Sequence, residues 1–244
     1  MKLYSVQFKL ENPKTNIEKV KNFLEKVENS SLVLLPEMWY SGFDYDNLTL
    51  FADLTPNILK ELMKISREKS LVICGTLPER TSKGIMNVAF LIEDGKLLGK
   101  RGKIKLFSLF DEDKYFIPDD KNEVFETKFG KVGILICFEI RFTDLILELQ
   151  KNKPDIVLVP AQWGFKRKDH FMALTKSRAI ELQAYLVASN TWGEYLGTRF
   201  AGYSSIYSPW GETLAFSEKG DVILSAEYDK DYLMEVRKTL PIKI

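Results

Sequence analysis

The stretch from Lys131 to Leu145, KVGILICFEIRFTDL, constrains the fold more than any other part of the chain. Residues 132–136 form a continuous apolar run, as a strand covered on both faces requires, and residues 138–150 change to helical spacing. Cys137 stands at the junction. The positive end of a helix dipole there would favour a thiolate, and the backbone N–H of Phe138 would face an oxyanion. The alternative is that Cys137 is a small buried hydrophobic residue.

Strands and helices alternate along the rest of the sequence. A hairpin is expected around Asp94-Gly95, and Thr15 with Glu18 forms a plausible capping box for the first helix. The strand that begins at Asp155 is expected to end at Pro160. The expected strands are 3–9, 31–35, 71–77, 87–93, 96–100, a short one near 124, 155–159, 185–189, 203–207, 213–216 and 222–228, and the remaining helices are 16–28, about 56–69, 168–182 and 230–238.

Two segments resemble each other. LVLLPEMW (Leu32 to Trp39) and IVLVPAQW (Ile156 to Trp163) share a strand–Pro–x–x–Trp pattern, which indicates two halves with related units. No Pro-rich or Ser/Gly-rich linker separates them, so residues 1–244 are expected to form a single domain. Two sheets packed face to face, each with helices outside, would accommodate so many strands. The sequence therefore predicts an α/β fold, specifically a four-layer α-β-β-α sandwich.

Charge and composition exclude several functions. The net charge of +1 gives no field that would attract nucleic acid, and no apolar run approaches the length of a membrane span. The N-terminus lacks a signal-peptide core, so we expect a cytoplasmic protein with reduced thiols at Cys74 and Cys137. The single histidine, His170, lies in a polar run and is expected on a solvated face. Neither a Cys–His pair nor a zinc cluster is therefore expected, and no metal or cofactor is predicted.

Three polar residues follow predicted strands. Glu37, Lys103 and Cys137 each come just after a strand, and reactive groups gather at the carboxyl ends of strands in layered α/β folds. A carboxylate that takes the thiol proton, a sulfur that attacks a carbonyl or nitrile carbon and an ammonium beside the oxyanion could together perform acyl transfer. Taken singly, Glu37 and Lys103 could equally be solvated surface residues.

The local sequences resemble the nitrilase, or carbon–nitrogen hydrolase, superfamily. Its three catalytic blocks correspond in order to LPEMWYSGF around Glu37, GKIKLF around Lys103 and ICFEIRF around Cys137. Further matching blocks are PAQW, SRAIELQAYLVASN and GYSSIYSPWGE, so the resemblance spans nearly the whole chain. It implies the same sandwich fold, a Glu37–Lys103–Cys137 triad and a second glutamate, at Glu112, that orients the lysine and the substrate. It also implies a homodimer, for which Leu145, Ile146 and Leu149 could supply a face or could equally cover the protein's own sheet.

Within that superfamily the sequence is most similar to the ω-amidase branch, chiefly through PEMWYSGF. This resemblance implies hydrolysis of the terminal amide of 2-oxoglutaramate or 2-oxosuccinamate through a thioester. Other amidohydrolases of the superfamily, acting on N-carbamoyl amines or aliphatic amides, and a non-catalytic scaffold remain alternatives. The sequence departs from the family pattern at Lys105, Thr143 and Gln162.

The substrate is expected in a narrow, aromatic-walled pocket. Tyr40, Phe43 and Trp163 are the expected walls, and Phe138 is the expected oxyanion donor. A substrate carboxylate would need a cation, for which the sequence offers Lys166, Arg167 and Arg199 without deciding among them.

Overall fold

Two six-stranded sheets form the centre of the computed structural model, which describes residues 1–242. The first sheet has the order β14-β1-β2-β3-β4-β5 and the second the order β13-β12-β9-β8-β7-β6. The first contains β1 (Lys2–Gln7), β2 (Leu32–Leu34), β3 (Val72–Thr81), β4 (Gly84–Glu93), β5 (Lys96–Gly102) and β14 (Val222–Glu227). The second contains β6 (Val124–Thr127), β7 (Gly130–Ile134), β8 (Ile156–Ala161), β9 (Tyr185–Asn190), β12 (Ser204–Tyr207) and β13 (Thr213–Ser217).

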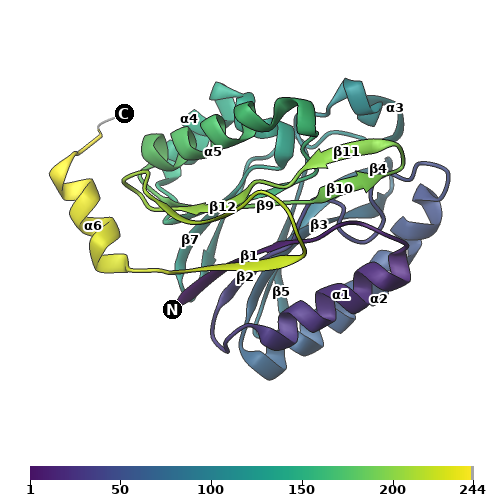
Figure 1. The fold of residues 1–244 in the computed structure, drawn as a ribbon, viewed down its shortest axis with the longest axis horizontal. Coiled ribbons are helices and arrows are strands. Elements are labelled where there is room, and N and C mark those ends of the chain that lie inside the picture. The colour runs from purple at the N-terminus through teal and green to yellow at the C-terminus, as the bar shows by residue number, and fades with distance from the viewer. Residues whose placement is uncertain (243–244) are drawn as a thin grey trace.

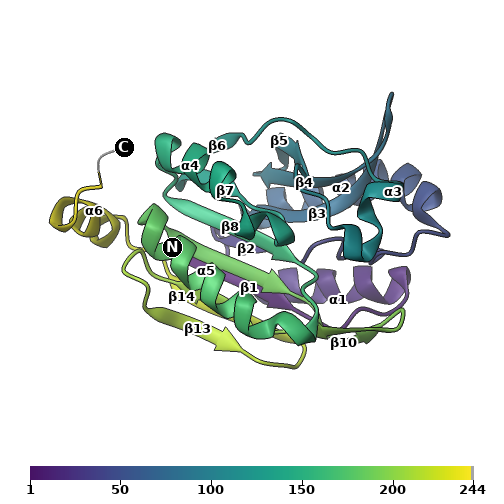
Figure 2. The same cartoon turned by 90° about the horizontal axis from the view of Figure 1, so that it is seen from above.

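Helices cover the outer face of each sheet, as Figure 1 and the perpendicular view in Figure 2 show. The helices α1 (Pro13–Lys26) and α2 (Leu48–Lys69) cover the first sheet, and α4 (Thr143–Asn152) and α5 (Lys168–Leu182) cover the second. Two further helices are α3 (Glu112–Tyr115) and α6 (Lys230–Thr239), and three 3₁₀ turns span Ser108–Phe110, Cys137–Arg141 and Phe165–Arg167. The predicted four-layer α-β-β-α sandwich is confirmed.

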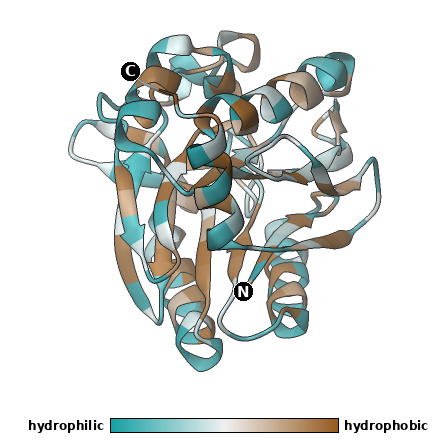
Figure 3. Cartoon of the chain, turned by 90° about the vertical axis from the view of Figure 1, so that its left-hand side faces the viewer, coloured by the Kyte–Doolittle hydropathy of each residue, from teal (hydrophilic) through white to brown (hydrophobic). Residues whose placement is uncertain are grey.

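The alternation of side chains along β2 explains why the layers hold together. Leu32 and Leu34 lie in the core between the two sheets, whereas Val33 and Leu35 lie in the core between the first sheet and its helices. Successive residues of a strand point to opposite faces, so an uninterrupted apolar run fits a strand that is covered on both sides. In Figure 3 hydrophobic colour runs along the central strands, whereas the outer helices carry both hydrophobic and hydrophilic segments.

Hydroxyl groups also join the sheets directly. Ser5 Oγ of β1 donates a hydrogen bond of 2.7 Å to the carbonyl of Ala188, and Ser189 Oγ of β9 donates one of 2.5 Å to the carbonyl of Val6. Both serines are fully buried, so these bonds satisfy polar groups that would otherwise be costly in the core. They fix the relative position of β1 and β9 and therefore of the loops at the ends of both sheets.

Several predicted boundaries were wrong for identifiable reasons. The first helix begins at Pro13, because Asn12 accepts the hydrogen bond from the Thr15 N–H that caps it, in place of the predicted Thr15–Glu18 box. The second helix begins at Leu48 and contains Pro56, which was expected near its start. The strand β8 continues through Pro160 to Ala161, because a parallel neighbour, β9, supports it. The hairpin of β10 (Trp192–Tyr195) and β11 (Thr198–Ala201) was not predicted.

The predicted helix 138–150 is two elements. A 3₁₀ turn covers Cys137–Arg141, the backbone of Phe142 is extended, and α4 starts at Thr143. Leu145, Ile146 and Leu149 of α4 are buried in the protein's own core. The face that the sequence offered for a homodimer is therefore occupied within the chain, and the dimer itself stays a prediction.

No helix within residues 1–242 is long and apolar enough to cross a membrane.

Candidate active site

Glu37 lies in the turn that follows β2 and is fully buried. Its Oε1 accepts hydrogen bonds of 2.8 Å from Asn87 Nδ2 and of 2.8 Å from Lys103 Nζ, and its Oε2 accepts one of 3.0 Å from the backbone N–H of Gln162. Each donor comes from a different segment, and Gln162 belongs to the second sheet's side of the molecule. The carboxylate is therefore held in one orientation at the interface of the two sheets.

Lys103 follows β5 and stands between two carboxylates. Its Nζ lies 2.8 Å from Glu37 Oε1 and 2.7 Å from Glu112 Oε1. Burial lowers the pKa of this ammonium, but the carboxylates of Glu112 and Glu37 outweigh burial and hold the pKa above its ordinary value. Lys103 is consequently a fixed cation at neutral pH and is not placed to act as a base.

Glu112 opens the short helix α3 and is almost completely buried. Its Oε2 accepts a hydrogen bond of 3.2 Å from the N–H of Phe107, and its other oxygen binds Lys103. Burial raises the pKa of Glu112 to about 7, and the attraction of Lys103 opposes that rise without overcoming it. The carboxyl group therefore titrates near neutrality, which is unusual for glutamate.

Cys137 occupies a strained position. It follows the strand β7, its φ is +49°, in the left-handed region that costs free energy for a residue with a Cβ, and 7% of its surface is exposed. Burial, followed by the negative charge of Glu37, raises the pKa of the Cys137 thiol, and Lys103 only partly offsets them. The expectation that a helix dipole favours a thiolate was wrong, because the α-helix begins six residues later, at Thr143. Burial and Glu37 thus favour the neutral form of the thiol.

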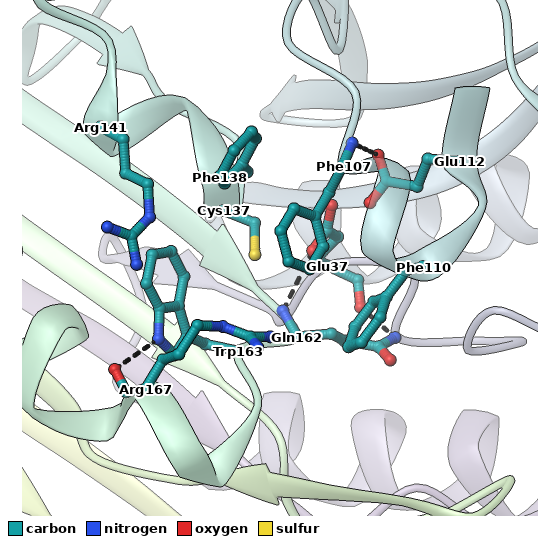
Figure 4. A pocket seen from close by; sticks show the side chains of 10 residues that line it. All are labelled: Glu37, Phe107, Phe110, Glu112, Cys137, Phe138, Arg141, Gln162, Trp163 and Arg167. Atoms are coloured by element: carbon teal, nitrogen blue, oxygen red, sulfur yellow. Dashed lines mark hydrogen bonds between the residues drawn. The ribbon is translucent and has the colours of Figure 1, made fainter.

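Glu37, Glu112 and Cys137 line one small pocket (Figure 4). In Figure 4 the sulfur of Cys137 points into its centre, with the carboxylates of Glu37 and Glu112 to one side and Arg141 to the other. The cavity is lined by Glu37, Phe107, Phe110, Glu112, Cys137, Phe138, Arg141, Gln162, Trp163 and Arg167. A thiol beside a buried carboxylate and a fixed cation has the components of nucleophilic acyl transfer.

Only two of the four expected substrate-binding residues line the cavity. Phe138 and Trp163 line the cavity. Tyr40 does not reach it, because its ring packs edge-on against Phe51 in the core beneath the helices of the first sheet. Phe43 lines a neighbouring hollow, where its ring centre lies 6.0 Å from Lys103 Nζ. The aromatic wall on that side is instead supplied by Phe107 and Phe110, which the sequence reasoning missed.

Arg141 is the other missed residue. Among the cations that the sequence offered, only Arg167 lines the cavity, while Lys166 and Arg199 line an adjacent pocket. Arg141 stands four residues after Cys137 in the block FEIRF, and this spacing was the available signal, since a turn of helix or 3₁₀ structure brings such a residue back toward the cysteine. Its side chain also contacts the exposed His170, with 3.0 Å between Arg141 Nη2 and His170 Nδ1.

The three departures from the family pattern have separate consequences. Lys105 turns away from Lys103 and forms an ion pair of 2.7 Å with Asp144 at the surface. Thr143 is exposed and begins α4. Gln162 supports the position of Glu37, because its side-chain Nε2 donates a hydrogen bond of 2.8 Å to the carbonyl of Glu37.

No group of three or more His, Cys, Asp or Glu side chains in the part of the chain that the structure describes, residues 1–242, is arranged to hold a metal ion.

The fold is an α-β-β-α sandwich whose cavity holds a thiol and a buried carboxylate, and comparison with known proteins identifies the family. Residues 4–238 match the family model of the carbon–nitrogen hydrolases. The chain is 31% identical over 234 residues to a 2-oxoglutaramate amidase of Bacillus subtilis, covering 94% of this chain and 90% of that protein. It is 30% identical over 228 residues to an omega-amidase of Xenopus tropicalis, covering 88% and 83% of the two chains.

Solved structures agree on the fold. A carbon–nitrogen hydrolase from Helicobacter pylori superposes with a TM-score of 0.91 at 24% identity, over 99% of this chain and 93% of that one. Nit3 of Saccharomyces cerevisiae, a nitrilase-superfamily member, gives a TM-score of 0.89 at 23% identity, and the match covers 100% of this chain and 95% of that one. The chain belongs to the carbon–nitrogen hydrolase family and is an enzyme of that class.

Proposed function

We propose that the protein is a thiol amidase that hydrolyses the terminal amide of a small dicarboxylic acid monoamide, such as 2-oxoglutaramate or 2-oxosuccinamate, to the acid and ammonia. The observation that carries this proposal is a pair of guanidinium groups, Arg141 and Arg167, in the cavity that holds Cys137. The names of the relatives, a 2-oxoglutaramate amidase and an omega-amidase, support the same substrate class.

The two arginines lack a carboxylate partner within residues 1–242 and pack against aromatic rings. The Arg141 Cζ lies 4.8 Å from the centre of the Trp163 ring, and the Arg167 Cζ lies 5.0 Å from that of Phe107. Burial lowers the pKa of Arg141, and the like charge of Arg167 lowers it further. A substrate carboxylate would relieve this repulsion and match the forked donors of a guanidinium. A neutral amide would leave both cations unpaired.

The proposed reaction begins with proton transfer. Glu37 takes the proton of the neutral Cys137 thiol, and the sulfur attacks the carbon of the substrate amide. The negative charge on the amide oxygen is stabilised by the Lys103 ammonium and the Phe138 N–H. Glu37 then gives its proton to the departing nitrogen, so that ammonia leaves and a thioester remains on Cys137.

The second half of the reaction uses the same groups. Glu37 takes a proton from water, and the oxygen attacks the thioester carbon. The carbon–sulfur bond breaks, the acid is released, and the proton returns to Cys137. Throughout, Glu112 keeps Lys103 in place through the ion pair of 2.7 Å.

The test compares kcat/KM for 2-oxoglutaramate and succinamate with that for butyramide and an N-carbamoyl amino acid. Arg141→Met removes the proposed charge pair between Arg141 and the substrate carboxylate. It should therefore reduce kcat/KM for the dicarboxylic monoamides about 100-fold or more. It should leave butyramide hydrolysis nearly unchanged. Lys166→Met is the matched control, because Lys166 lies outside the Cys137 cavity.

The kcat/KM values of the four test compounds also decide whether the proposed substrate class is right. If butyramide or the carbamoyl compound is hydrolysed better than both dicarboxylic monoamides, the carboxylate-binding role of the arginines is wrong. If no amide is hydrolysed and the Cys137 thiol is unreactive, the chain is a non-catalytic scaffold.

A further inference from the structure

The carboxylate of Glu139 is buried beside the nucleophile but is not exposed to the cavity. Glu139 has no exposed surface, and it does not line the pocket that contains Cys137. Its Oε2 accepts hydrogen bonds of 2.7 Å from Arg101 Nη1 and of 2.7 Å from the backbone N–H of Ile136. Its Oε1 accepts one of 2.6 Å from the backbone N–H of Ile104. The backbone N–H of Lys105 donates a longer bond of 3.5 Å to the same Oε1. A single side chain therefore accepts from four donors that belong to two distant segments.

The two backbone donors are neighbours of catalytic residues. Ile136 immediately precedes Cys137 and follows β7 of the second sheet, whereas Ile104 immediately follows Lys103 and β5 of the first sheet. We propose that Glu139 is a positioning residue, which fixes the distance between the Cys137 sulfur and the Lys103 ammonium by joining the two backbone segments that carry them. This inference rests on the proposed catalytic roles of Cys137 and Lys103.

The strained backbone of Cys137 explains why such a link is needed. With φ at +49°, the residue would relax toward an ordinary conformation if its neighbours were free. Glu139 holds the turn at both ends, because its own N–H donates a hydrogen bond of 3.1 Å to the carbonyl of Ile136 while its side chain accepts from the Ile136 N–H. The same contacts of Glu139 therefore hold the strained turn and position the Cys137 sulfur.

Arg101 forms a buried ion pair of 2.7 Å with this carboxylate. Both side chains of the pair are fully buried, and within residues 1–242 the Arg101 Nε and Nη2 atoms have no hydrogen-bond partner. Glu139 is thus the group that balances the Arg101 guanidinium. A surface ion pair, Lys105 with Asp144, also joins the two segments. Because both of its side chains are partly exposed, it does little to hold the segments at a fixed distance.

Glu139→Gln tests the proposal, because an amide has one acceptor oxygen and cannot accept from Ile104 and Ile136 as a carboxylate does. We expect kcat on the best amide substrate to fall about 100-fold, as for a small misplacement of catalytic groups, with KM changed less than about threefold. Alkylation of Cys137 by iodoacetamide should also slow, and its pH profile should move upward, since Lys103 would stabilise the thiolate less.

Asp155→Asn is the matched control. Asp155 also binds one guanidinium, Arg237 at 2.9 Å, and one backbone N–H, that of Lys131 at 3.1 Å, but it lies at the opposite end of β7 from Cys137. This variant should keep kcat and the alkylation profile. Alkylation needs no substrate, so it reports on Glu139 even if the proposed amides are not hydrolysed.

The unpaired Arg101 could prevent Glu139→Gln from folding, and the double variant R101M/E139Q removes that charge. The expected loss of kcat and slower alkylation should then appear in the double variant. The proposal is overturned if either folded variant keeps both quantities within threefold of the parent. It is also overturned if neither folds while Asp155→Asn does, because Glu139 would then be a folding residue.

Discussion

The two sheets bring different chemistry to one cavity. The loops after β2 and β5 of the first sheet supply the ion pair of Glu37 and Lys103, whereas the turn after β7 of the second sheet supplies the thiol of Cys137. The proposed base and the proposed nucleophile therefore come from different sheets. The relative placement of the sheets therefore decides whether the groups can react.

The two similar segments, LVLLPEMW and IVLVPAQW, differ in the same way at the level of single residues. In LVLLPEMW the residue after the proline is Glu37, and in IVLVPAQW it is Ala161. The segments meet directly, because the N–H of Glu37 donates a hydrogen bond of 3.4 Å to the carbonyl of Ala161 and the N–H of Gln162 donates to the Glu37 carboxylate. One copy of the motif carries Glu37, the proposed base, and the other copy holds its carboxylate in place.

The largest effect should come from the thiol of the second sheet. Cys137→Ala should fold and lose at least about 10⁴-fold in kcat, because the covalent route is removed. The first sheet also contains a buried cysteine, Cys74, which provides the control. Burial raises the pKa of Cys74, and it packs in the core, so Cys74→Ala should keep kcat while costing about 1–2 kcal/mol of stability in a denaturant titration. Substantial turnover by Cys137→Ala would rule out the thioester.

The next largest effect should come from the cation of the first sheet. Lys103→Met removes the charge beside the oxyanion and should lower kcat about 10²- to 10³-fold. Lys105→Met, two residues away, breaks only the surface ion pair with Asp144 and should change kcat less than about threefold. If steady-state assays show a larger loss of kcat for Lys105→Met than for Lys103→Met, the proposed role belongs to Lys105 and the assignment to Lys103 is wrong.

The pH dependence should report on Glu112. Because the pKa of Glu112 in the folded protein is about 7, protonation below that pH leaves Lys103 with one charged carboxylate fewer. We expect kcat/KM to rise with pH through about 7 and expect Glu112→Gln to lack this limb. The folded protein binds the proton more tightly than the unfolded chain, so Glu112 should favour folding at low pH and lose that contribution as pH rises from about 4.5 to about 7. Identical pH profiles for the two proteins would contradict this assignment.

The smallest effect should come from the support that the second sheet gives to Glu37. Gln162→Met removes the side-chain hydrogen bonds of 2.8 Å to the Glu37 carbonyl and of 3.3 Å to the Met38 carbonyl but keeps the backbone N–H that binds the carboxylate. We expect kcat to fall about 10-fold, in line with the loss of one short and one long buried hydrogen bond. A loss as large as that of Lys103→Met would mean that Gln162 acts on the substrate itself.

The sequence by itself determined the layered fold, because uninterrupted apolar strands such as residues 132–136 require cover on both faces. It also placed Glu37, Lys103 and Cys137 just after predicted strands, and the resemblance to the family added Glu112. Local pattern was sufficient there, since strand periodicity and short motifs are properties of neighbouring residues.

Only the tertiary structure decided the environment of those groups. The raised pKa of the Cys137 thiol depends on burial and on Glu37, which is 100 positions away in the sequence and reaches it only through the packing of two sheets. The cavity lining by Phe107, Phe110 and Arg141, the burial of Tyr40 and the link through Glu139 depend on the same packing. Such contacts join residues from separate elements, so no local spacing encodes them.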